Sequence, residues 1–133
     1  MDSEHSAPGC LPRLGRSFQC ALAGCAQALR GQQNLRIHLA FVLAITGLAL
    51  YLQVGLTQWA ILVLTYSLVL AAELMNSALE ALTDLVSPEY HPLAGQAKDL
   101  AAGSVLVAAI GAVIVGLLIL GPPLWAKITL WAR

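Results

Sequence analysis

The sequence predicts an all-α membrane protein in which three transmembrane helices follow an amphipathic surface helix. Of the 133 residues, 59% are hydrophobic and 11% are charged, and the mean hydropathy is +0.77. A soluble domain carries about 25% charged residues. Three long apolar stretches follow a shorter segment with helical periodicity, and these stretches predict the spans.

The composition also excludes two classes of protein. Seven Lys and Arg residues balance seven Asp and Glu residues, so the formal net charge is zero. A nucleic-acid binder would show a basic excess, and a disordered chain would lack this apolar content. The length suits one domain. We expect a flexible N-terminus over residues 1–10 and a single integral membrane domain over residues 11–133.

The surface helix is expected over about residues 11–31. Its apolar residues recur at steps of three and four, and Arg13, Arg16 and Arg30 lie at its ends. The apolar positions are Leu14, Phe18, Leu22, Cys25, Ala26 and Leu29. This pattern fits a helix that lies in the membrane interface beside anionic lipid. It fits a helix packed on its own protein equally well, and the two placements are compatible.

The three spans are expected over about residues 35–54, 58–86 and 97–121. A span needs about 20 mostly apolar residues, and the third stretch meets this alone before it ends at two consecutive prolines. The second stretch meets it only if the helix continues through Glu73. No Pro or Gly interrupts residues 58–86, so we predict one helix there, about 43 Å long.

The orientation follows from the basic residues. With three spans, the N-terminal region and the loop after the second span share one side of the membrane. That side holds five basic residues and the other holds two. The five are Arg13, Arg16, Arg30, Arg36 and Lys98, against Lys127 and Arg133. We therefore expect a cytoplasmic N-terminus.

A narrow polar stripe on the second span carries the chemistry. Glu73, Asn76, Glu80 and Asp84 fall on one face of an otherwise apolar helix. Measured from Gln58, Glu73 lies about 22 Å along the helix and Glu80 about 33 Å. Glu73 is therefore inside the membrane and Glu80 at its aqueous edge. An ionisable residue at membrane depth is a functional candidate; the alternative is that Glu73 pairs with a basic residue of a neighbouring helix.

A lysine follows the stripe at the start of the third span. Lys98 and Asp99 are placed within reach of the acidic residues, and His38 lies at the interface, from where it can approach the site. Mg²⁺ is usually held by one or two carboxylates together with substrate phosphates, and a lysine can neutralise phosphoryl charge. We therefore expect a divalent metal and a phosphate-bearing substrate. The alternative is an ion pair that only fixes helix packing.

Three segments carry a resemblance to a known family. ELMNSALEALTD (73–84), SPEYHPLAGQAKDLAAG (87–103) and NLRIH (34–38) resemble the prokaryotic diacylglycerol kinase family, which includes the undecaprenol kinases. The resemblance covers about residues 11–120. It implies phosphorylation of a membrane lipid alcohol, diacylglycerol or undecaprenol, by ATP with Mg²⁺. It also implies a homotrimer with composite sites at subunit interfaces, in the cytoplasmic (inner) membrane of a prokaryote.

The resemblance also implies residue roles. Glu73 matches the catalytic base, Glu80 matches a metal-binding glutamate, and Asn76 lies in the same site. Lys98 and Asp99 match residues that serve the nucleotide phosphates.

Two further positions lie near the surface helix. Arg13 matches an arginine that contacts nucleotide. The family usually has another metal-binding glutamate at the end of the surface helix, where this chain has Gln32. A neutral amide can coordinate Mg²⁺ through its oxygen or through water, but it contributes no charge. We therefore expect Gln32 to contact nucleotide or metal, and the affinity for metal to be weaker.

Two other functions are alternatives to a lipid kinase. A catalytically silent scaffold or binding subunit is favoured only by Gln32, which stands where the family usually has a metal-binding glutamate. A silent chain has no reason to keep a costly buried carboxylate. A proton-coupled transporter that uses Glu73 gains little support from three spans with one polar stripe. The apolar residues of a lipid pocket do not indicate the chain length of the lipid, so the sequence does not distinguish diacylglycerol from undecaprenol as the substrate.

Overall fold

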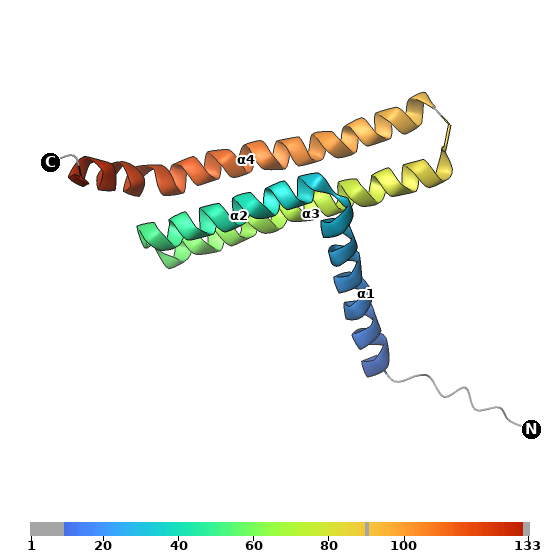
Figure 1. Ribbon diagram of the computed structural model, residues 1–133, viewed down its shortest axis with the longest axis horizontal. Helices are drawn as coiled ribbons and strands as arrows, with labels where there is room; N and C mark the ends of the chain where they lie inside the picture. The colour runs from blue at the N-terminus through green and yellow to red at the C-terminus, as the bar shows by residue number, and fades with distance from the viewer. Residues whose placement is uncertain (1–9, 90, 132–133) are drawn as a thin grey trace, which may run out of the picture.

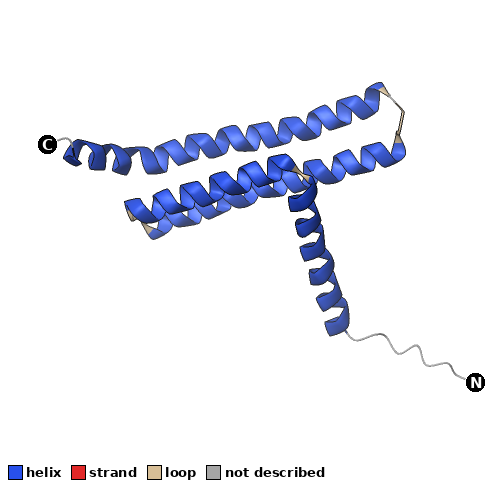
Figure 2. Cartoon of the chain, in the orientation of Figure 1, coloured by secondary structure: helices blue, strands red, loops and turns tan. Residues whose placement is uncertain are grey.

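The computed structural model describes residues 10–89 and 91–131, which form four helices (Figures 1 and 2). These are α1 (Cys10–Gly31), α2 (Gln33–Leu52), α3 (Leu56–Val86) and α4 (Pro92–Trp131). Of residues 1–10, which the sequence predicts to be flexible, residues 1–9 lie outside the described residues, and Cys10 is the first residue of α1. The last three helices are each long and apolar enough to cross a membrane. The predicted all-α class is confirmed, with three helices that are able to span a membrane.

A tight turn joins α2 to α3. Gln53 adopts a left-handed conformation, with φ of 55°, and its backbone N–H donates to carbonyls in the last turn of α2. The Gly55 N–H donates to the side-chain oxygen of Gln58 at 2.8 Å. α2 therefore ends, and α3 begins, two residues earlier than the spans at 35–54 and 58–86 predict. Both differences come from capping, which hydropathy does not register.

α4 is longer than the predicted third span. It continues through Pro122 and Pro123 to Trp131, although each proline removes one backbone donor. The Lys127 ammonium donates to the Tyr51 carbonyl oxygen at 2.9 Å and lies 3.9 Å from the centroid of the Tyr51 ring. This double contact attaches the end of α4 to the end of α2.

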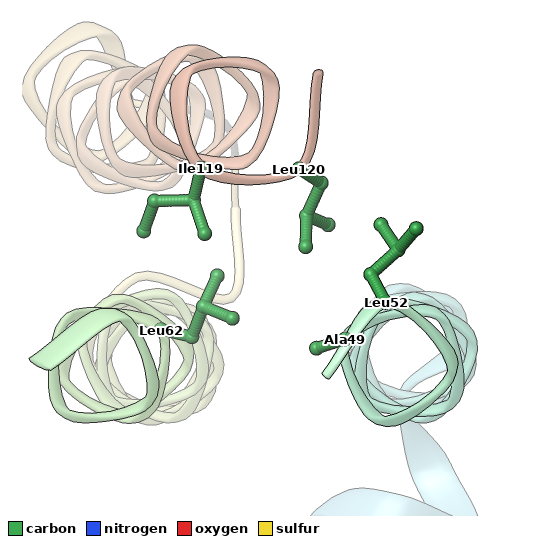
Figure 3. Close-up of a cluster of buried hydrophobic side chains, with 5 residues drawn as sticks. All are labelled: Ala49, Leu52, Leu62, Ile119 and Leu120. Carbon is green, nitrogen blue, oxygen red and sulfur yellow. The ribbon is translucent and has the colours of Figure 1, made fainter. Parts of the chain in front are cut away.

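The buried apolar core is small and lies where α2, α3 and α4 meet near the α2–α3 turn. Figure 3 shows its five side chains converging from the three helices. They are Ala49, Leu52, Leu62, Ile119 and Leu120. Leu62 is 1% exposed, so this cluster is the best-packed apolar region in the described part of the chain.

Most apolar side chains lie on the surface. The chain exposes 10408 Å², whereas a compact soluble monomer of this mass exposes about 6,700 Å². Large aliphatic residues along all three long helices contribute to the exposed area, including Leu64, Leu106 and Leu118. A surface of this kind must be covered by lipid tails or by other copies of the chain.

α1 leaves the bundle at a steep angle near the start of α2 (Figure 1). Leu14, Phe18 and Leu22 of its apolar stripe are exposed, while Ala28 and Leu29 in its last turns are half-buried. Only the C-terminal end of α1 therefore packs on the protein. An exposed apolar stripe on a helix that runs across the bundle fits the interfacial placement.

We predict that Leu62→Ala lowers the free energy of unfolding in detergent micelles by about 2 kcal/mol, the low end of the range for buried leucines. The value is low because an unfolded helix in a micelle keeps the side chain out of water, which leaves mainly the packing loss. Leu64→Ala, on the exposed face of the same helix, should change the stability little. Equal losses in thermal or SDS-induced unfolding of the two variants would contradict this assignment of the core.

Candidate active site

The polar stripe of α3 becomes more exposed along the helix. Glu73 is 2% exposed and Asn76 is 6% exposed. Glu80, one turn further, is half-buried, and Asp84 is exposed. The order of burial agrees with the order of membrane depth expected from the sequence. Glu73 is the most buried of the four residues, and Asp84, near the C-terminal end of α3, is exposed.

Glu73 contacts a histidine from a neighbouring helix. The Nε2 atom of His38, on α2, lies 3.1 Å from Oε1 of Glu73. The side chain of His38 is 22% exposed, against 2% for Glu73. The contact is an ion pair when the imidazole is protonated. Glu73 therefore does have a basic partner, and this partner is a titratable side chain rather than a permanent charge.

The next two residues of the stripe interact with each other. Nδ2 of Asn76 donates to Oε1 of Glu80 at 3.0 Å. Oδ1 of Asn76 is buried and has no hydrogen-bond partner. A buried acceptor without a partner is unusual, and it is available to a ligand in the adjoining space.

These side chains line one pocket of about 310 Å³. The polar residues at its wall are Asn34, His38, Glu73, Asn76 and Glu80, and Ile37 of α2 and apolar residues of α4 complete it. We call this space the polar pocket. It brings together the stripe of α3 and one face of α2, so the fold assembles the predicted catalytic and metal-binding glutamates in one place.

The donors in the polar pocket fit Mg²⁺ if a substrate supplies further ligands. Among the described residues, no three His, Cys, Asp or Glu side chains form a metal cluster. Mg²⁺ does not need such a cluster, because it is usually held by one or two carboxylates with substrate phosphates and water. The Glu80 carboxylate and the unpartnered Oδ1 of Asn76 are the oxygen donors that this cation prefers.

Lys98 pairs with the last residue of the stripe. Its ammonium group forms an ion pair with Asp84 across the α3–α4 connection, and it does not line the polar pocket. The expected approach of Lys98 to the acidic stripe is therefore observed. The side chain of Asp84 is 66% exposed and that of Lys98 is 38% exposed, and ion pairs that water reaches contribute little to stability. Lys98 can exchange this partner for another anion at small cost.

Two other predicted residues, Asp99 and Gln32, do not line the polar pocket. Asp99 is exposed on α4. Gln32 is half-buried in the connection between α1 and α2, where its backbone N–H donates to the Ala28 carbonyl at 2.8 Å. The side chain of Arg13 lies outside the described part of the chain. Within one copy of the chain, the pocket therefore gathers some of the predicted site residues and not all of them.

The sequence pattern does not assign Asn34 to the site, and for His38 it predicts only an interfacial position from which the side chain can approach the site. Asn34 and His38 are four residues apart, which places them on one face of α2. A polar pair at this spacing at the start of an apolar span is a signal that could have identified the α2 side of the pocket.

A second, apolar space adjoins the polar pocket. It has a volume of about 430 Å³ and lies between α2, α3 and α4. Aliphatic and aromatic side chains line it, together with small residues of α4 such as Ala112 and Gly116. We call it the apolar groove. His38 and Ala109 line both spaces, so the groove leads to the residues that surround Glu73.

Comparison with known proteins identifies relatives over most of the chain. The family model for prokaryotic diacylglycerol kinase matches residues 19–120. A diacylglycerol kinase of Synechocystis is 48% identical over 114 residues, which cover 85% of this chain and 65% of the relative. An undecaprenol kinase of Bacillus subtilis is 36% identical over 114 residues, which cover 86% of this chain and 93% of the relative.

A diacylglycerol kinase of Escherichia coli is 39% identical over 83 residues, which cover 62% of this chain and 64% of the relative. The match thus spans just under two thirds of the Synechocystis and Escherichia coli relatives and nearly all of the Bacillus subtilis one. With a matching family model over residues 19–120, the chain belongs to the prokaryotic diacylglycerol kinase family.

Proposed function

We propose that this chain is an integral membrane lipid kinase that transfers the γ-phosphoryl group of ATP to a membrane lipid alcohol. The observation that carries the proposal is the buried carboxylate of Glu73, which lines the polar pocket and contacts His38, a residue that lines both the pocket and the apolar groove. Membership of the family supports the same reaction. The retention of a costly buried carboxylate argues against a silent scaffold.

The groove and the pocket suit the two parts of a lipid alcohol. The hydrocarbon chain lies in the apolar groove, and the hydroxyl reaches Glu73. The Glu73 carboxylate accepts the hydroxyl proton while the oxygen forms a bond to the γ-phosphorus and the bond to the leaving ADP oxygen breaks. Phosphoryl transfer is mostly positioning and electrostatics, so a small scaffold with few polar residues suffices. The apolar surroundings exclude the water that would hydrolyse ATP.

The outer part of the polar pocket suits the nucleotide. Glu80 and Asn76 would hold Mg²⁺ together with the phosphates, and the bound cation neutralises phosphate charge. For the nucleotide we assign Lys98 and Asp99, at the start of α4. The α1 side contributes Arg13 and Gln32.

We further propose a homotrimer with composite sites, embedded in the cytoplasmic membrane of a prokaryote with the N-terminus inside. The extensive exposed apolar surface supports an assembly, because other copies can cover part of it. The polar pocket of one copy also lacks Lys98, Asp99 and Gln32 in its lining. A second copy that packs against the pocket could supply these groups.

We predict that Glu73→Gln lowers kcat for phosphate transfer by about 100-fold or more, because the amide cannot accept the hydroxyl proton. The assay measures transfer of labelled γ-phosphate from ATP in mixed micelles with Mg²⁺, with diacylglycerol and undecaprenol offered separately and in competition. The labelled product also identifies the lipid. Glu89→Gln, in the exposed α3–α4 connection, is the matched control and should retain activity. Full activity of Glu73→Gln would overturn the role of the base.

We predict that Gln32→Glu lowers the Mg²⁺ concentration needed for half-maximal activity by about tenfold, because it adds one negative charge beside the metal. Glu80→Gln should raise that concentration, since it removes a charge. Titration of activity with Mg²⁺ at saturating ATP measures both changes. An unchanged Mg²⁺ dependence in Gln32→Glu would show that residue 32 does not contact the metal.

A further inference from the structure

His38 occupies a position that neither the stripe nor the proposed reaction accounts for. It is the residue of α2 that contacts Glu73, at 3.1 Å between Nε2 and Oε1. It also lines both the apolar groove and the polar pocket. No other described side chain lies within ion-pair or hydrogen-bond distance of the Glu73 carboxylate.

A buried glutamate needs such a contact if it is to act as a base. Three side-chain torsions separate its carboxylate from the helix backbone, so a carboxylate without a partner can take several orientations. A catalytic group must be held within about 0.5 Å of its productive position. The imidazole reaches Glu73 from a different helix, so the packing of α2 against α3 fixes one carboxylate oxygen and leaves Oε2 available.

We propose that His38 is a positioning residue for Glu73. Its imidazole holds Oε1, so that Oε2 is presented to the lipid hydroxyl at the end of the apolar groove. This inference rests on the proposed function, because it concerns the orientation of the proposed base. In this proposal His38 acts through Glu73, and it is assigned no contact with the nucleotide or the transferred phosphoryl group.

Two variants with the same amide group but different side-chain lengths, His38→Asn and His38→Gln, test the proposal. The side-chain nitrogen of glutamine reaches about the position of Nε2 in histidine, whereas that of asparagine falls short of it. We expect His38→Asn and His38→Leu to lower kcat by about 100-fold, as displacement of a reacting group by about 1 Å does. We expect His38→Gln to stay within about tenfold of the wild type. KM for ATP should be unchanged in all three variants, so the loss should fall on kcat.

The control variant is Gln33→Leu, an exposed position on the same helix, which should keep the wild-type kcat. A double variant, His38→Leu with Glu73→Gln, should be no less active than Glu73→Gln alone, because no base remains to be oriented. A structural role would instead give a further loss in the double variant. Thermal unfolding in micelles identifies any variant that fails to fold. If His38→Leu fails to fold, the kcat of His38→Asn compared with that of His38→Gln tests the positioning role.

Three results would overturn the proposal. Wild-type kcat in His38→Asn and His38→Leu would remove the positioning role while the proposed function stands. A His38→Gln variant as slow as His38→Leu would show that the size of the imidazole matters and its nitrogen does not. A wild-type protein that transfers phosphate to no lipid would overturn the proposed function, and the positioning role with it.

Discussion

The structure is organised around one constraint, which is that a carboxylate lies inside a helix otherwise suited to hydrocarbon. A charged or polar group removed from water needs a partner, and α3 alone offers Glu73 none. α2 therefore packs beside α3 and supplies His38 at 3.1 Å, while α4 covers the same region with apolar side chains. The result is 2% exposure of Glu73 on a helix whose other faces remain open to lipid.

The two ends of the bundle are stabilised in different ways. Near the α2–α3 turn, packing of Leu62 with aliphatic side chains of α2 and α4 forms the core, and the Lys127–Tyr51 contact secures the ends of α4 and α2. Near the other end, polar contacts along the stripe replace apolar packing. A cavity is tolerated there because its lining includes groups that can bind a ligand, such as the unpartnered amide oxygen of Asn76.

The fold class and the number of apolar helices could be predicted from the sequence, because apolar content and helical periodicity are properties of short, continuous segments of the chain. The stripe of α3 could be predicted for the same reason. The positions of Gln32 and Lys98 relative to the pocket could not, since they depend on how the helices pack. The continuation of α4 past its two prolines was also missed, because the contact that attaches its end joins Lys127 to Tyr51, 76 residues away in the sequence.

The junction at His38 has a consequence for the path of a lipid. Each methylene group that leaves hydrocarbon for water costs about 0.8 kcal/mol, so extraction of a long-chain alcohol into a water-filled cleft would be prohibitive. The apolar groove and the polar pocket share His38 and Ala109 in their walls, so the boundary between the apolar and the polar environment lies inside the protein. Under the proposed function, a lipid substrate can enter by lateral diffusion with its chain immersed throughout, and its phosphorylated product can return to the bilayer by the same route.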